Sequence, residues 1–291
     1  MSEILDGAAE LLATARRVDP DRTLCAVLAP PAARAELLAL ILLDHELARV
    51  AGIVRQPLTG LIRLRFWRDQ LALAASGGRP DHPIAHALAR PLRDGRLPLA
   101  ELEPLIDARV RELDGLLDPG TGSAAPPPTL EAVAEHLRAT SGGLARAMAR
   151  LLGAEAVELE AAEQAGTALG LVGIVRATLV EARRQPRLAT RSLADLAGLR
   201  PGELADEAAR DRLRALTGRL LERASASIAA ARRAGRPVHR ARLAPLLFAT
   251  VAEVRLRQLR RADCDPLRAS ADGRSILLPL RLVLGWLRAR P

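Results

Sequence analysis

The stretch PPAARAELLALILLDHELARVAGIV, residues 30–54, decides the fold class that the sequence predicts. Its two prolines suit a helix start, because a proline in the first turn removes no helical hydrogen bond. Apolar residues then recur every three or four positions, which is the spacing that lines one face of a helix. We therefore predict a long helix that begins at Pro30–Pro31 and runs to about Val54.

The same pattern continues along the rest of the 291 residues. Helix-favouring Ala, Leu, Arg and Glu dominate, and runs of β-branched residues are short. Further helices are expected over residues 58–75, 81–92 (capped by Asp81), 98–117, 129–152 (capped by Thr129), 154–184, 204–234 and 275–288. The small residues at 141–143 favour close helix packing. The prediction is an all-α single domain over residues 1–291, with residues 118–128 (DPGTGSAAPPP) as a flexible Pro/Gly loop.

The formal net charge of +9 does not indicate a nucleic-acid partner. All basic residues other than histidine are arginine, and the sequence has no Lys, Asn or Tyr. These three residues have AT-rich codons, so their joint absence is typical of a bacterial genome of high GC content. The four aromatic residues are too few to form a base-stacking platform. We expect no nucleic-acid binding.

From its hydropathy and cysteine content, we expect a cytoplasmic protein, with a peripheral position at the inner membrane as the alternative. No apolar run reaches the roughly 18–20 residues that span a bilayer, and residues 1–17 lack the apolar core of a secretory signal. Cys25 and Cys264 are too few for a disulfide framework. Residues 276–287, together with Arg281, Arg288 and Arg290, are compatible with a helix lying on a membrane surface.

Short motifs identify no catalytic group. His45–Glu46 begins a zinc-protease pattern, but Arg49 stands where the second histidine is required. His82 and His86 share a helix face without a third ligand. We interpret these residues as ordinary helix-surface groups.

The acidic residues do not form the pairs that magnesium-dependent diphosphate chemistry needs. Two such pairs at i,i+4 spacing would put carboxylate oxygens on facing helices. The apolar helix around residues 165–180 contains no acid before Glu181. Asp107, Glu112 and Asp114 lie on an arginine-rich helix and are expected to form exposed salt bridges.

Several stretches together resemble the squalene/phytoene synthase family, and they occur in the family's order over almost the whole chain. GLIRLRFWR at residues 60–68 is similar to the family's IRLQWWR signature. Other matching elements are Asp21–Leu24, His82–Pro83, Ser141–Gly142, Gly166–Ala168 and Ile174–Arg176. The resemblance implies an isoprenoid-synthase-type helical bundle with a central cavity. In catalytic members it also implies magnesium and head-to-head prenyl transfer.

The family's first catalytic motif does not carry over. Its Asp-x-x-x-Asp pattern falls on His45 and Arg49, with Glu46 between them. An arginine at this place would put positive charge where metal and diphosphate are held. The resemblance therefore predicts an eroded first motif.

The second motif is also changed. The family pattern QLTNILRD reads Gly170-Leu-Val-Gly173-Ile-Val-Arg176-Ala177 in this chain, with Glu181 as the one acid nearby. Glycine and alanine side chains supply no oxygen to Mg²⁺. We expect no catalytic residue, no metal ligand and no cofactor; magnesium would be needed only if the chain were a prenyltransferase.

The erosion is similar to that of one family branch, which includes a mitochondrial complex I assembly factor. Ala177–Thr178, Arg183–Arg184, residues 261–266 and residues 277–280 carry this resemblance. It implies a non-catalytic role in complex I assembly, with complex I subunits or assembly intermediates as partners. Two alternatives stay open: a phytoene- or squalene-synthase-like prenyltransferase, and a protein that binds an isoprenoid lipid or quinone in the cavity.

Overall fold

The structure, a computed structural model, describes residues 2–54, 56–117, 129–184, 206–233, 238–268, 275 and 277–291. Every regular element in these ranges is helical, which confirms the predicted all-α class. The predicted loop 118–128 and the irregular segment after residue 184 lie outside the described residues. No helix among the described residues is long and apolar enough to cross a membrane.

The helices follow one another with short connections. They are α1 (Ser2–Val18), α2 (Pro20–Ala26), α3 (Pro31–Ile53), α4 (Pro57–Ala75), α5 (Pro83–Arg93), α6 (Glu103–Leu117), α7 (Leu130–Leu137), α8 (Gly143–Leu151), α9 (Ala156–Arg184), α11 (Glu207–Arg233), α12 (Phe248–Arg261) and α13 (Leu277–Leu287). A 3₁₀ turn precedes α6 at Leu99–Glu101, another precedes α12 at Arg240–Arg242, and a π turn joins α7 to α8 at Arg138–Gly142.

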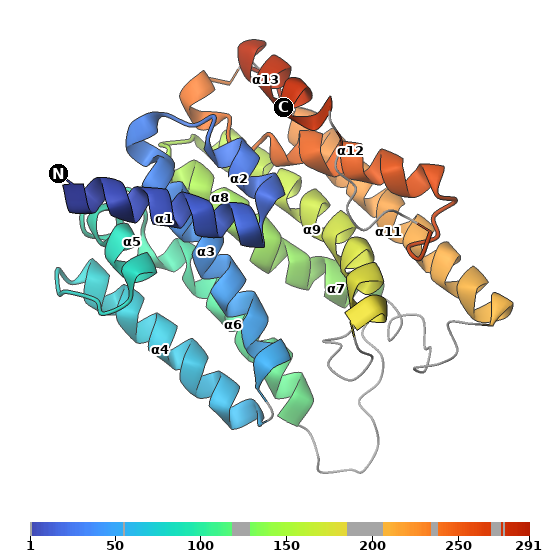
Figure 1. The fold of residues 1–291 in the computed structure, drawn as a ribbon, viewed down its shortest axis with the longest axis horizontal. Helices are drawn as coiled ribbons and strands as arrows, with labels where there is room; N and C mark the ends of the chain where they lie inside the picture. The colour runs from blue at the N-terminus through green and yellow to red at the C-terminus, as the bar shows by residue number, and fades with distance from the viewer. Residues whose placement is uncertain are drawn as a thin grey trace.

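Two central helices organise the bundle, and Figure 1 shows the others arranged around them. Helix α3 packs against α1, α5, α6 and α8, whereas α9 packs against α8, α11, α12 and the π turn. Helix α13 lies over α12 at one margin of the molecule, and α4 lies at the opposite margin. The two central helices therefore separate the amino-terminal helices from the carboxy-terminal ones.

Helix α3 is more deeply enclosed than the spacing of its apolar residues predicts. Every residue from Leu37 to Asp44 is buried, so neighbours surround this part of the helix on all sides. A helix that is apolar all round belongs in the interior of a bundle. Because the apolar run covers every face, the sequence pattern cannot show which face of α3 meets which neighbour.

The structure confirms one predicted cap and corrects another. The Thr129 hydroxyl accepts a hydrogen bond from the Ala132 amide at 3.1 Å and caps α7, as predicted. The prediction that Asp81 caps α5 is wrong, because the cap is His82, whose Nδ1 accepts from the Ile84 amide at 3.2 Å. The Gln70 side chain accepts hydrogen bonds from the backbone amides of both Asp81 and His82. The helix therefore begins after them, at Pro83.

Small residues bring α9 against the π turn, as the sequence predicts. A Cβ atom added to Gly166 would overlap the Ser141 carbonyl oxygen and lie 2.7 Å from Ala145 Cβ and 2.9 Å from Gly142 Cα. No side chain larger than hydrogen fits there without separating the two segments. The glycine therefore fixes the distance between α9 and the π turn.

We predict that Gly166→Ala lowers the free energy of unfolding by about 1–3 kcal/mol, because the added methyl group meets backbone atoms that cannot move aside easily. Urea denaturation followed by circular dichroism measures the change. Gly218→Ala is the matched control in α11, since an added Cβ there meets nothing within 4 Å. It should be neutral or stabilise by up to about 1 kcal/mol. Equal stability of the two variants would contradict the packing argument.

Candidate functional site

A cavity of about 890 Å³ lies inside the bundle, between α3, α6, α7, the π turn and α9. This volume is within the range of pockets that bind small molecules. Its lining residues are Arg22, Asp44, Ala48, Ala108, Arg109, Arg111, Glu112, Ala132, Val133, Glu135, His136, Leu137, Thr140, Ser141, Gly170, Gly173, Ile174 and Ala177. The cavity thus combines charged groups with an apolar wall.

The wall that α9 contributes includes three of the predicted second-motif positions. Gly170, Gly173 and Ala177 all line the cavity. Arg176 is not among the lining residues, and the side chain of Glu181 lies outside the described residues. Three of the predicted second-motif positions are therefore brought together at the cavity, and none of the three carries a polar side chain.

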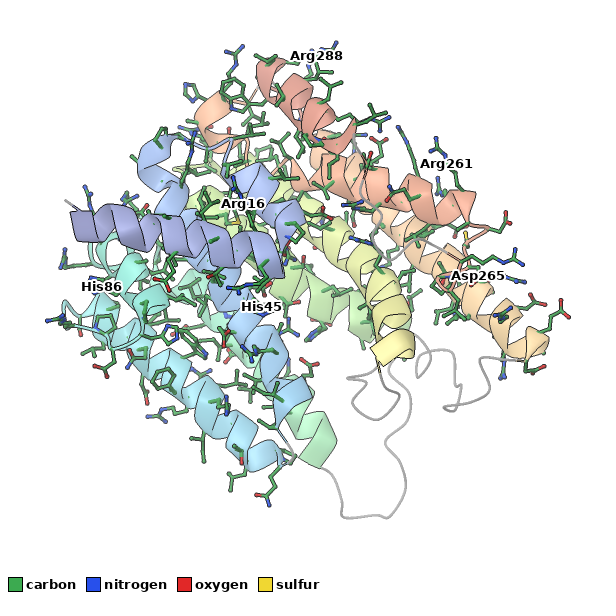
Figure 2. All side chains as sticks on the ribbon, in the orientation of Figure 1. Arg16, His45, His86, Arg261, Asp265 and Arg288 are labelled. Carbon is green, nitrogen blue, oxygen red and sulfur yellow. The ribbon has the colours of Figure 1, made fainter. Side chains whose placement is uncertain are left out.

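The wall that α3 contributes does not include the predicted first-motif positions. The α3 residues that line the cavity are Asp44 and Ala48, not His45 and Arg49. One residue corresponds to a turn of about 100° around a helix, so the two pairs of residues lie on neighbouring sides of α3. Arg49 instead pairs with Glu46 at 3.0 Å on the outside of α3, and Figure 2 labels His45 on the same helix.

The sequence analysis therefore missed Asp44 as a cavity residue. Its carboxylate is buried and accepts a hydrogen bond from Arg22 Nη1 at 3.2 Å. The four-residue spacing of Asp44 and Ala48 could not have identified them, because His45 and Arg49 have the same spacing. The continuous apolar run before Asp44 also gave no periodicity from which to choose between them.

A second charged cluster lies across the cavity on α6 and α7. Arg109 donates to Glu112 Oε2 at 3.0 Å, and its Nη1 lies 3.2 Å from His136 Nε2. Glu112 is therefore part of the cavity wall, contrary to the prediction that it forms an exposed salt bridge. Asp107 does pair with Arg68 at a partly exposed position, as predicted.

The carboxylates around the cavity come singly rather than in facing pairs. They are Asp44 on α3, Glu112 on α6 and Glu135 on α7. In the described part of the chain, no three His, Cys, Asp or Glu residues lie close enough together to hold a metal ion. Because Mg²⁺ takes oxygen ligands, the glycine and alanine side chains on the α9 wall provide none of the donors that it requires.

Comparison with known proteins identifies the family. The model of the squalene/phytoene synthase family matches residues 15–281. The chain belongs to the squalene/phytoene synthase family. Its fold is similar to a dehydrosqualene synthase (TM-score 0.73, 16% identity, 98% of this chain and 97% of that one). It is also similar to squalene synthase HpnC from Alicyclobacillus acidocaldarius (TM-score 0.68, 17% identity, 91% and 97% covered).

Relatives with higher sequence identity carry a different name. The chain is 26% identical over 277 residues to a Bos taurus protein named NADH dehydrogenase (ubiquinone) complex I, assembly factor 6, covering 94% of this chain and 80% of that protein. The protein of the same name from Mus musculus is 27% identical with the same coverage. The Homo sapiens protein is 25% identical over 271 residues, covering 92% and 78%.

In this family member, Arg22 occupies the end of the cavity where Asp44 lies. Its guanidinium group donates to Asp19 at 2.9 Å, to Asp44 at 3.2 Å and to the Ser141 hydroxyl at 2.5 Å. Ser141 in turn donates to the Gly166 carbonyl at 2.7 Å. Burial alone would lower the pKa of Arg22, but Asp19 and Asp44 more than offset it and raise the pKa.

Arg176 belongs to a neighbouring ion cluster centred on Asp21. Arg255 donates to this carboxylate through Nε at 2.9 Å and Nη2 at 2.5 Å, and Arg176 donates to it at 3.2 Å. Burial and the positive charge of Arg255 lower the pKa of Arg176, whereas Asp21 opposes that shift. The structure therefore places Arg176 in an ion pair that joins α9 to α2.

We predict that Asp21→Asn lowers the free energy of unfolding by about 3–5 kcal/mol, because it leaves the buried Arg255 charge without its carboxylate. Chemical denaturation measures this loss. The double variant Asp21→Leu/Arg255→Met should lose less stability than the sum of the losses in Asp21→Leu alone and Arg255→Met alone. Asp69→Asn is the control, since Asp69 pairs with Arg65 at an exposed position and should change stability by less than about 1 kcal/mol. Additive losses in the double variant would contradict direct coupling.

Proposed function

We propose that this chain is a non-catalytic member of the squalene/phytoene synthase family that acts in the assembly of respiratory complex I. The observation that carries the proposal is the α9 wall of the cavity, where Gly170, Gly173 and Ala177 stand at the second-motif positions. Complex I subunits or assembly intermediates would be its partners. The relatives named assembly factor 6 support this role over nearly the full chain.

The electrostatics of the cavity support the absence of prenyl transfer. Ionising an allylic diphosphate leaves a strongly anionic leaving group, which magnesium ions neutralise when several carboxylates hold them. Asp44 is the α3 carboxylate at the cavity, and Arg22 already compensates its charge. A fixed guanidinium group on this carboxylate competes with any metal ion for the same oxygen atoms.

The cavity itself favours a second candidate function. Its volume of about 890 Å³ and the apolar side chains of Ala48, Val133, Leu137 and Ile174 suit a long apolar ligand. An isoprenoid lipid or quinone held there is compatible with a role in complex I assembly. Prenyl transfer, in contrast, requires a diphosphate site of a different kind.

We predict that the purified chain makes no C30 or C40 product from farnesyl or geranylgeranyl diphosphate with magnesium and NADPH. Chromatography of organic extracts measures this, with an active squalene synthase as the positive control. A product above the vector control would contradict the non-catalytic proposal. The same extracts test the second function, because a polyprenyl compound that co-purifies in stoichiometric amount would place a lipid in the cavity.

We predict that deletion of the gene in the source organism lowers NADH:quinone oxidoreductase activity of its membranes, while succinate oxidation stays unchanged. The wild-type gene should restore the activity. Asp44→Asn should restore it too wherever the variant accumulates, because Asp19 still pairs with Arg22 and Asp44 is not a metal ligand in the proposed function. Asp69→Asn is its surface control. Immunoblotting verifies that each variant accumulates. Normal complex I activity in the deletion strain would overturn the assembly role.

A further inference from the structure

Helix α13 (Leu277–Leu287) presents apolar side chains on two opposite faces. Leu278 and Leu282 are 2% and 1% exposed and attach the helix to the body of the protein. Five other aliphatic residues are between 38% and 56% exposed, namely Leu277, Leu280, Val283, Leu284 and Leu287. At about 100° per residue these five span an arc of about 120°, centred opposite Leu278 and Leu282. The α13 outer face, as we call these five residues, is thus a continuous apolar surface.

Positive charge without negative charge surrounds the α13 outer face. Residues 275–291 contain Arg281, Arg288 and Arg290 but no Asp or Glu. Among the described residues, none of these three arginines forms an ion pair with a carboxylate. Figure 2 shows Arg288 at the outer margin of the molecule, beside α13. The surface therefore offers free guanidinium groups next to aliphatic side chains.

An indole group lies on the same helix. Trp286 is half-buried, and the Arg240 guanidinium group stacks over its ring at 5.3 Å from the centroid. Arg240 also donates to the Leu287 carbonyl at 2.8 Å, which ties the end of α13 to the preceding 3₁₀ turn. Tryptophan and arginine together are typical of the boundary between water and acyl chains.

Among the described residues, a second exposed apolar surface differs from α13 in its charge. Helix α4 exposes Leu58, Ile62, Phe66 and Leu73. Beside them, Arg65 pairs with Asp69 and Arg68 pairs with Asp107, while Arg63 forms no ion pair with a described carboxylate. Two of the three arginines of α4 are therefore compensated within the protein, whereas none of the three arginines near α13 is.

We propose that the α13 outer face binds the surface of an anionic lipid bilayer, with its five aliphatic side chains among the acyl chains and Arg281, Arg288 and Arg290 level with the phosphates. An 11-residue helix is about 16 Å long and lies along the surface rather than across the membrane. The inference goes beyond the proposed function, because it concerns where the protein docks. It is the same whether the cavity is empty or contains a lipid.

Sedimentation with lipid vesicles tests the proposal. The full chain should bind vesicles of three parts phosphatidylcholine to one part phosphatidylglycerol, and bind pure phosphatidylcholine weakly. Arg281→Gln/Arg288→Gln should weaken binding about 30-fold, since each arginine near an anionic surface contributes about fivefold. Raising the salt concentration should have a similar effect. Binding that is equal for both lipids would overturn the role of charge.

The apolar contribution has a matched control. Leu280→Gln/Leu287→Gln should weaken vesicle binding about tenfold or more, because it removes two aliphatic side chains from the α13 outer face. Leu58→Gln/Ile62→Gln changes equally exposed residues on α4 and should leave binding unchanged. All four positions are exposed, so thermal unfolding should change little in both variants. Equal effects of the two double variants would overturn the assignment to α13.

Fluorescence of the unmodified chain gives a measurement independent of any variant. Brominated acyl chains should quench Trp286 but not Trp67, which is buried at 5% exposure on the inner side of α4. Loss of about half of the emission is therefore expected on anionic vesicles. The opposite result is a wild-type chain that neither binds vesicles nor shows quenching, while the α13 variants lose complex I activity in cells. The α13 outer face would then be a protein contact, and the lipid proposal would be wrong.

Discussion

The packing of α2 against the two halves of the bundle depends on burying positive charge next to negative charge. Arg22 and Arg255 are both enclosed, and an unpaired buried guanidinium group is strongly destabilising. The compensating carboxylates come from the α2 cap (Asp19), from α2 itself (Asp21) and from α3 (Asp44). These pairs connect α3 with α12 through α2, and Ser141 extends the connection to the π turn. The cavity is therefore closed at this end by ion pairs within the protein.

This closure gives the cavity a particular chemistry. In the squalene/phytoene synthase fold, two central helices face one another across a cavity, and here the faces bear Asp44 on one side and Gly170, Gly173 and Ala177 on the other. The space is large enough for a small apolar molecule, and two of its carboxylates, Asp44 and Glu112, are paired with arginine.

The surface carries two apolar regions with different electrostatics. Among the described residues, the three arginines that flank the α13 outer face have no carboxylate partner, whereas two of the three arginines of α4 are paired. The two helices lie at opposite margins of the bundle (Figure 1). If α13 rests on a bilayer, α4 faces away from it, which leaves the α4 surface accessible to a protein partner.

The sequence by itself determined the all-α class, most helix positions, the close packing at residues 141–143 and the absence of side-chain oxygens at Gly170, Gly173 and Ala177, since periodicity, caps and residue types are local properties. It did not determine that Asp44 faces the cavity, because the seven apolar residues 37–43 before it leave no polar face to read. Only the tertiary structure decided that Glu112 lines the cavity and that Arg176 meets Asp21. Those contacts join residues far apart in the chain, and no local pattern encodes which charges will meet.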